Sequence, residues 1–408
     1  MKYKITLLIV FAVCFCCCER DTITETEIGK IASTFLIYLG DEYVGVDLYE
    51  MELVDKGICY SEKTATPTIN DNRTDIPYCS NDGTYIVKLD HVKEGVTYAY
   101  RVFIKKEDAV VYGEVKSFTM AKTAQGWLQK ANFPGSERRH AVGFSIGSKG
   151  YIGLGSDISS DNFKDFWEYN PFFNSWTQKA SFEPHTRGQV TGFSIGNKGY
   201  IVNSYNENNF WEFEPVTNRW TKKADFPGLV RAAAVGFAIG NKGYVGTGRY
   251  VFSINTDHND FWEYDPATDQ WTKKADFPGG PRYSAVGFSI GDKGYVGAGC
   301  VDPNFGNKKD FWEYNPAINQ WTRIADFPDQ TNNCAIGFSI ENKGYVGIDC
   351  SGDFWEYDPI TNKWTRRADF PGKSKGNAAG FVIANKGYIG TGGFDDFPNM
   401  RDFWEFKP

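Results

Sequence analysis

A column of basic residues is the clearest chemical pattern in this chain. One residue stands five positions before the glycine of each of six Gly-Phe pairs, and the six are Arg138, Arg187, Arg231, Arg282, Asn332 and Lys375. Five of them are cationic, although the formal net charge of the protein is -7. A guanidinium presents paired N–H donors that match carboxylate and sulfate oxygens. If the repeats are structurally equivalent, the column forms a ring that could bind an acidic ligand.

A structural role explains the same column equally well. Arginine side chains also donate hydrogen bonds to the carbonyl groups of neighbouring loops, and this role needs no ligand. The residue types alone leave both interpretations open.

The segments between the repeated motifs vary in sequence, as binding surfaces on a fixed scaffold do. Their aromatic side chains could offer flat faces to a sugar, and these are Tyr205, Tyr250, Phe252, Phe305, Phe394 and Phe397. Their possible acid or base groups are Glu137, Glu207, Asp257, Asp302, Asp349 and Asp395. No spacing selects a catalytic pair among these carboxylates. The histidines of this region (His140, His185 and His258) occupy non-equivalent positions, so we expect neither a metal nor a cofactor.

The residues that must position such groups belong to a repeat. The motif Phe-Trp-Glu-(Tyr/Phe) recurs with its tryptophan at 167, 211, 262, 312, 355 and 404. A second tryptophan recurs at 127, 176, 220, 271, 321 and 364, and the two columns contain all twelve tryptophans of the chain. A period of 43 to 51 residues with several short strands indicates the blades of a propeller. We expect the repeated aromatic residues to fill the space between neighbouring blades.

One repeat shows the expected order of strands. Apolar alternation predicts strands over residues 284–291, 293–299, 310–316 and 320–325. The sequence Gly-Asp-Lys-Gly fits a tight hairpin, and we expect its last glycine, Gly294, to adopt a positive φ. Proline in Asp-Phe-Pro ends the fourth strand because it has no N–H to donate.

This order of motifs resembles the kelch repeat, a four-stranded propeller blade. The resemblance covers residues 126–408 and recurs six times, although the Gly-Gly doublet of the family is intact only at Gly392-Gly393. The chain ends in a third strand, so we expect residues 126–131 to supply the fourth strand of the last blade and to close the ring. The family further implies that the loops between strands two and three surround the mouth of an axial channel.

The same family includes enzymes. Galactose oxidase needs a copper site with a Cys-Tyr crosslink and two histidines, which we do not find in this sequence, so a copper oxidase is not expected. A bacterial sialic-acid mutarotase is also a six-bladed kelch protein. It needs only carboxylates and cations, so a mutarotase or epimerase acting on an acidic sugar stays an alternative.

Residues 22–121 lack both tryptophan columns and form a separate unit. Their alternating runs predict strands, and the segment "LDHVKEGVTYAYRVFI" resembles the part of a fibronectin type III or immunoglobulin-like sandwich that carries the tyrosine corner, with Tyr98 as the candidate. We therefore expect an all-β protein, in which a small β-sandwich precedes a propeller spanning residues 122–408.

Residues 1–18 resemble a bacterial lipoprotein signal. A basic start is followed by an apolar run from Ile5 to Phe15 that is too short to span a membrane. Cys18 is the expected acylated residue and Cys17 the alternative; an ordinary cleaved signal would also fit. Outside this segment, Cys334 and Cys350 flank a hairpin and form a possible disulfide.

These observations together predict a binding protein of the bacterial cell envelope. The acidic composition and the lack of a basic tract argue against nucleic-acid partners. We expect an outer-membrane lipoprotein, exposed at the cell surface or facing the periplasm, that contacts the membrane through its lipid only. Its ligand is a glycan or an acidic protein segment on the loop face of the propeller. A purely structural envelope scaffold is a further alternative.

Overall fold

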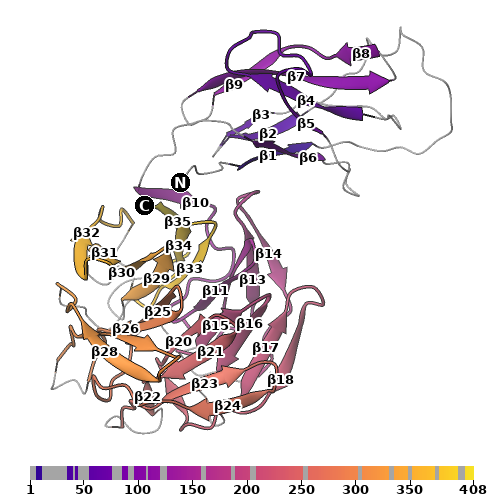
Figure 1. Cartoon of the computed structure of the whole chain (residues 1–408). Coiled ribbons are helices and arrows are strands. Elements are labelled where there is room, and N and C mark those ends of the chain that lie inside the picture. Colours follow the sequence, from indigo (N-terminus) through magenta and orange to yellow (C-terminus); the bar gives the residue numbers. More distant parts are fainter. Residues whose placement is uncertain are drawn as a thin grey trace. The chain divides into compact units, whose positions relative to one another are not determined.

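The computed structural model is an all-β structure that divides into two compact units, residues 1–124 and 125–408 (Figure 1). The described residues are 6–11, 35–39, 42–44, 55–75, 85–90, 96–106, 109–119, 126–157, 162–184, 189–202, 208–250, 256–301, 306–329, 335–347, 352–372, 376–393 and 400–408. None of these ranges contains a helix. The boundary between the units lies close to the expected one at residues 121 and 122.

The first unit contains two antiparallel sheets. One has the strand order β3-β2-β1-β6, and its strands are β1 (Thr6–Phe11), β2 (Phe35–Leu39), β3 (Glu42–Val44) and β6 (Tyr85–Asp90). The other has the order β5-β4-β7-β8, with β9 also paired to β7. Its strands are β4 (Asp55–Ser61), β5 (Asn72–Asp75), β7 (Thr97–Lys106), β8 (Ala109–Tyr112) and β9 (Lys116–Thr119).

Two expectations fall in this unit. Tyr98 of β7 is buried, and its hydroxyl donates to Oε2 of Glu62 at 3.4 Å. Strand β1 lies inside the expected signal peptide and pairs with β2 and β6. This pairing belongs to the uncut chain and does not test cleavage, so the signal peptide stays a prediction.

The second unit contains six four-stranded antiparallel sheets, which we number 1 to 6. Sheet 1 comprises β11 (Val142–Ile146), β12 (Lys149–Gly153), β13 (Phe166–Asn170) and β14 (Ser175–Lys179). Sheet 2 comprises β15 (Thr191–Ile195), β16 (Lys198–Val202), β17 (Phe210–Glu214) and β18 (Arg219–Lys223). Sheet 3 comprises β20 (Val235–Ile239), β21 (Lys242–Gly246), β23 (Phe261–Asp265) and β24 (Gln270–Lys273).

Sheets 4 to 6 repeat this arrangement. Sheet 4 comprises β25 (Val286–Ile290), β26 (Lys293–Gly297), β27 (Phe311–Asn315) and β28 (Gln320–Ile324). Sheet 5 comprises β29 (Ile336–Ile340), β30 (Lys343–Gly347), β31 (Phe354–Asp358) and β32 (Lys363–Arg366). Sheet 6 comprises β33 (Ala379–Ile383), β34 (Lys386–Gly390), β35 (Phe403–Lys407) and β10 (Gly126–Lys130). A two-stranded ribbon of β19 (Arg231–Ala232) and β22 (Arg249–Tyr250) joins the loops of sheet 3.

The sheets are arranged in a closed ring. The first strand of each sheet contacts the first strand of the next, in the order β11, β15, β20, β25, β29, β33 and back to β11 (Figure 1). Sheet 6 takes its fourth strand from the other end of the unit, because β10 pairs along β35 with Trp127 opposite Phe406. The unit is therefore propeller-like, and β10 lies where the sequence predicts it.

A repeated pair of hydrogen bonds joins each sheet to the next. Trp176 Nε1 in sheet 1 donates to the carbonyl oxygen of Ala131 at 2.9 Å, and Asn174 Oδ1 accepts from the N–H of Ala131 at 2.9 Å. The same two bonds recur at Ala180, Ala224, Ala275 and Ala325. The indole of Trp127 completes the series by donating to the carbonyl of Ala368 at 3.0 Å. The second tryptophan column therefore joins neighbouring sheets through hydrogen bonds.

The hairpin between the first two strands of sheet 4 differs from the expected one. The positive φ falls on Gly291, the first glycine of Gly-Asp-Lys-Gly, at 59°. Gly294 is needed for a different reason, since a Cβ there would lie 2.6 Å from the ring of Phe237 in sheet 3. The expectation for Gly294 was wrong because glycine serves a close approach between sheets as well as an unusual φ.

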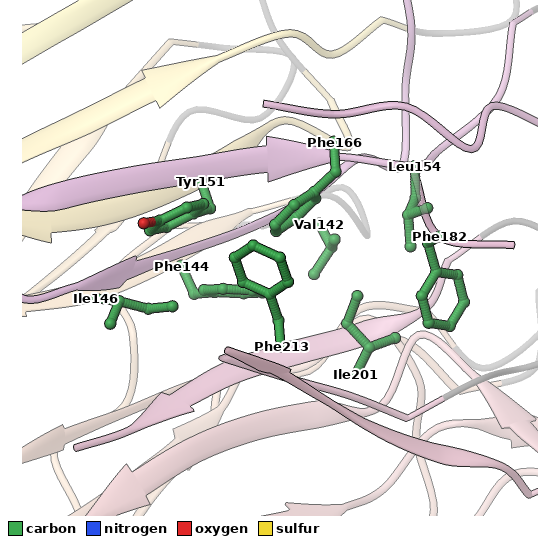
Figure 2. Packing of buried hydrophobic residues seen from close by; sticks show 9 residues of the cluster. All are labelled: Val142, Phe144, Ile146, Tyr151, Leu154, Phe166, Phe182, Ile201 and Phe213. Carbon is green, nitrogen blue, oxygen red and sulfur yellow. The ribbon is translucent and has the colours of Figure 1, made fainter. Parts of the chain in front are cut away.

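Aromatic residues fill the space between sheets, as expected. Figure 2 shows the cluster between sheets 1 and 2, in which Phe144, Tyr151 and Phe166 of sheet 1 face Phe213 of sheet 2. The ring centroids of Phe166 and Phe213 lie 5.1 Å apart in an edge-to-face arrangement, which aromatic pairs favour.

Candidate functional site

Arg282 shows what the basic column does where it is described. Its side chain is 0% exposed. Nη1 donates to Oδ1 of Asp310 at 2.8 Å and to the carbonyl of Ala298 at 2.9 Å, and Nη2 donates to Oδ2 of Asp310 at 3.0 Å. The carboxylate of Asp310 also accepts a bond of 2.7 Å from Trp312 Nε1. We call this set of three residues an Arg–Asp–Trp clamp.

Two further clamps have the same geometry. Arg138 pairs with Asp165 and Arg231 with Asp260, and both guanidiniums also donate to a carbonyl at the start of the loop after the second strand. In each clamp a phenylalanine ring covers the guanidinium. The distance from the arginine Cζ to the ring centroid is 4.7 Å for Arg138 and Phe133, 4.9 Å for Arg231 and Phe226, and 4.8 Å for Arg282 and Phe277.

The Arg282 clamp bridges adjacent sheets. The N–H of Arg282 donates to the carbonyl of His258 in sheet 3 at 3.2 Å, and the N–H of Gly248, also in sheet 3, donates to the carbonyl of Arg282 at 2.7 Å. The Arg282 guanidinium in turn donates hydrogen bonds to Ala298 and Asp310 of sheet 4. Burial alone would raise the pKa of Asp310, but the hydrogen bonds and positive charge of Arg282 outweigh burial and lower this pKa.

For three members of the column these contacts favour the structural interpretation over ligand binding. The three described arginines are buried, and their hydrogen bonds go to carboxylates and carbonyls of the protein itself, as in the structural interpretation. The sequence could not distinguish the two because both require an arginine. The other members of the column, Arg187, Asn332 and Lys375, lie outside the described residues, and a role of the whole column in ligand binding stays a prediction.

A second column, two residues further along the chain, surrounds the axis. Its described members are His140, Gln189, Ala233, Ser284 and Asn377. The N–H of His140 donates to the carbonyl of Asn377 at 3.0 Å, that of Ala233 to Gln189 at 3.1 Å, and that of Ser284 to Ala233 at 2.9 Å. Each bond joins neighbouring sheets just before their first strands. We call these five residues the axial collar.

Two side chains of the collar contact each other. Gln189 Nε2 in sheet 2 donates to Asn377 Oδ1 in sheet 6 at 3.3 Å, although sheet 1 lies between them in the ring. All five residues are half-buried, and positive φ values of 51° to 58° occur at His140, Ala233, Ser284 and Asn377. This column was not predicted from the sequence. Four of its five described members are polar, but they differ in type, so no motif marks them.

A polar cluster lies beside the collar at the junction of sheets 3 and 4. Arg249 Nε donates to Oδ1 of Asp257 at 2.7 Å, and the Arg249 guanidinium lies 3.7 Å from the ring centroid of Tyr283 in sheet 4. Tyr250, an expected ligand-stacking residue, is half-buried and pairs through β22 with Arg231. Asp257, an expected acid or base, therefore forms an ion pair with Arg249.

Of the other candidate residues named from the sequence, some are described and the rest are not. Glu137 is exposed, and His258 is half-buried in sheet 3 with its Nε2 buried. Burial, followed by the positive charge of Arg231, lowers the pKa of His258. The remaining residues lie outside the described ranges, and these are Cys17, Cys18, His185, Tyr205, Glu207, Phe252, Asp302, Phe305, Cys334, Asp349, Cys350, Phe394, Asp395 and Phe397. The possible disulfide and the lipidation site therefore stay predictions.

In the described part of the chain, no group of three or more histidine, cysteine or acidic residues could hold a metal ion. None of its segments forms a helix long and apolar enough to cross a membrane.

Comparisons with known proteins support a propeller-like fold and indicate no function. No protein-family model matches the chain, and no curated protein is similar to it. A solved structure of YjhT aligns with a TM-score of 0.56 and 17% identical residues, over 67% of this chain and 96% of that one. At this level of identity the likeness shows a shared fold alone.

Proposed function

We propose that the protein is a non-catalytic binding protein of the bacterial cell envelope. Residues 122–408 form a six-bladed kelch-type β-propeller in this proposal, and residues 22–121 form a β-sandwich that spaces it from a lipid anchor at Cys18. The ligand is a glycan bound on the loop face of the propeller, around the axial collar.

The observation that carries the proposal is the chemistry of the collar. Gln189, Ser284 and Asn377 place amide and hydroxyl groups around one axis. Such groups donate and accept hydrogen bonds without charge, and they match the hydroxyl and amide groups of sugars. Half-buried side chains at the mouth of a ring remain accessible to a ligand from the loop side.

The arginine clamps favour a glycan over an acidic protein segment. An acidic ligand would need free cations, and the three described arginines of the column are paired with carboxylates. Removing a guanidinium from such a pair to serve a ligand would leave a half-buried aspartate without its ionic partner. A neutral or weakly charged glycan can bind without a free cation.

No observation favours the alternative function of a mutarotase or epimerase. Asp257 is committed to Arg249, and Glu137 is exposed, so the described loops contain no paired acid and base. A purely structural scaffold predicts no soluble ligand and is separated from the proposal by the experiment below.

A glycan array tests the proposal. The full chain with Cys17→Ser and Cys18→Ser, which cannot be acylated, is applied to immobilised neutral and acidic glycans. We expect binding to a restricted set of neutral glycans that persists at 0.5 M NaCl. Binding to no glycan would contradict the proposal. Accelerated exchange of sugar anomers in an NMR spectrum would replace it with the enzymatic alternative.

A further inference from the structure

The sheets of the second unit turn back at two opposite ends of the ring. In each antiparallel sheet the hairpin between strands one and two and the turn between strands three and four lie at one end, and the loop between strands two and three lies at the other. Because the sheets form a closed ring, equivalent turns lie at the same level around the axis. We call the end with the hairpins and the turns between strands three and four the hairpin face. These hairpins and turns all belong to the described residues.

The two most exposed large apolar side chains of the described residues lie at tips of the turns between strands three and four. Val216 of sheet 2 is 91% exposed and Ile360 of sheet 5 is 90% exposed. The same turns expose Ile318 in sheet 4 and Phe173 in sheet 1, whereas sheet 3 has the small Ala267 there. A single exposed apolar residue is ordinary, but its recurrence at one place in four sheets marks that end of the ring.

The backbone of these turns is suited to a less polar environment. Each turn has proline at its first position, which has no N–H to satisfy. The N–H of the next residue donates to the side chain that ends the third strand. The five bonds join Phe172 to Asn170 (3.1 Å), Val216 to Glu214 (3.3 Å), Ala267 to Asp265 (2.9 Å), Ala317 to Asn315 (3.0 Å) and Ile360 to Asp358 (2.9 Å). The tips can therefore leave water with fewer unsatisfied donors.

A column of lysines lies on the same face. One lysine follows the hairpin between strands one and two in every sheet, and the six are Lys149, Lys198, Lys242, Lys293, Lys343 and Lys386. Five of them pair with a carboxylate in the third strand of their own sheet. In sheet 6 the carboxylate of Glu405 also lies 3.9 Å from Lys130, so that this network holds two lysines and one glutamate.

Lys149 of sheet 1 differs from the other five lysines. It has no ion pair within the described part of the chain, because the carboxylate of Glu168 is used elsewhere. Oε2 of Glu168 accepts a bond of 2.7 Å from the Tyr151 hydroxyl and lies 3.4 Å from Nζ of Lys179. Burial, together with the charge of Lys179, lowers the pKa of Lys149 against the attraction of Glu168. A half-buried ammonium without an ionic partner can bind an anion that approaches this face.

We propose that the hairpin face docks on the surface of a lipid bilayer, with the four apolar tips in the boundary between headgroups and acyl chains and Lys149 on a lipid phosphate. Apolar side chains accompanied by lysines are typical of protein surfaces that lie in this boundary, and anionic lipids attract the cations. The proposal goes beyond glycan binding and does not depend on it. It adds a membrane contact to the lipid at Cys18, which was the only one expected from the sequence. The loop face then points away from the bilayer.

The separation of the tips favours a bilayer over a protein partner. Each tip belongs to a different sheet, and exposed polar residues such as Thr217 and Thr361 stand beside the apolar ones. The core of a protein interface is a continuous, closely packed apolar patch. Fluid lipid, in contrast, can surround each tip separately. A second copy of this chain would need the same continuous patch and is disfavoured for the same reason.

Hydrogen–deuterium exchange and vesicle co-sedimentation test the proposal on the full chain carrying Cys17→Ser and Cys18→Ser. The vesicles contain phosphatidylethanolamine and phosphatidylglycerol. The tip variant is Val216→Ser/Ile318→Ser/Ile360→Ser. The matched control is Leu229→Ser/Thr217→Ser/Thr361→Ser, which gains as many serines and keeps the apolar tips; its Leu229 is exposed in the connection between sheets 2 and 3, at the loop end. Residues 5–15 are the same in every variant, so this apolar segment cannot cause a difference between them. Melting temperatures verify that all variants fold.

Vesicles should slow exchange at residues 171–174, 215–218, 316–319 and 359–362, and leave exchange at residues 226–230 unchanged. The tip variant should partition to vesicles at least tenfold less than the unaltered chain because it lacks three apolar side chains, whereas the control should stay within twofold. Lys149→Gln should weaken binding to these vesicles about threefold and leave binding to phosphatidylcholine vesicles unchanged.

Unchanged exchange at the four turns would overturn the proposal, and so would equal partitioning of the tip variant and the control. Slower exchange at these turns at high protein concentration, without vesicles, would also overturn it and make the hairpin face an interface between copies of the chain.

Discussion

The side-chain amide of Gln189 donates a hydrogen bond of 3.3 Å to that of Asn377, although the two residues come from sheets 2 and 6, which are separated by sheet 1. A contact that skips a sheet is possible only where the sheets converge. It therefore marks the narrowest part of the loop face. The collar carries two amides, a hydroxyl and the imidazole of His140, and the amides and the hydroxyl underlie the proposed glycan specificity.

The clamps are predicted to be structural. Arg282→Ala should lower the free energy of unfolding by about 3 kcal/mol, because the half-buried Asp310 would lose its ionic partner. Arg323→Ala in the same sheet should change it by less than about 1 kcal/mol, since the Arg323–Asp326 pair is more than half exposed at the arginine. Chemical denaturation measures both. Equal and small losses would show that the clamp does not hold sheets 3 and 4 together.

Closure of the ring depends on β10. Trp127 donates to the carbonyl of Ala368 and packs on Phe354, Phe370 and Phe406. Trp127→Ala should therefore destabilise the unit by about 3 kcal/mol. Gln129→Ala, an exposed position in the same strand, should have an effect within about 0.5 kcal/mol. A chain lacking residues 126–131 that melts at the temperature of the intact protein would rule out this role.

Stability should fall as the pH decreases from 7.5 to 5.5, in part through His258. Burial lowers its pKa in the folded state, so the unfolded chain binds the proton first, at a pH near 6.5. Burial alone would raise the pKa of the neighbouring Asp260, but its hydrogen bonds with Arg231 and the positive charge of Arg231 lower this pKa, so Asp260 stays charged in this range. His258→Gln should flatten the dependence of the melting temperature on pH. An unchanged pH profile in this variant would assign the dependence to other groups.

Acylation at Cys18 is predicted by the signal-like N-terminus. In a bacterial host, Cys18→Ser should move the protein from the membrane fraction to the soluble fraction and abolish labelling by a fatty-acid analogue. Labelling that survives in this variant and disappears in Cys17→Ser would move the site by one residue. Failure to label the unaltered protein would remove the anchor from the account.

The strands could be predicted from sequence more fully than the site. Apolar alternation places the strands of sheet 4 within two residues of their observed ends, because both faces of these strands are covered by repeated aromatic residues. The pairing of β10 with β35 also follows from the repeat, since each motif appears in the order of its strands.

The direction of side chains could not be predicted in the same way. Arg282 has the same sequence position whether its guanidinium faces solvent or Asp310, and only the folded loop brings the two together. The collar has no motif of its own. His140, Gln189, Ser284 and Asn377 differ in type and share only their place beside the axis. Their grouping becomes visible once the first strands close into a ring.

The most direct test of glycan binding at the collar is a titration of the variant Gln189→Ala/Asn377→Ala with the oligosaccharide that the unaltered protein binds best. The account predicts at least a tenfold loss of affinity with little change in melting temperature, because the two half-buried amides are not part of the core. Thr272→Ala, an exposed change in the fourth strand of sheet 3 and away from the loops, serves as the control and should bind normally. Unchanged affinity in the double variant would contradict the central claim.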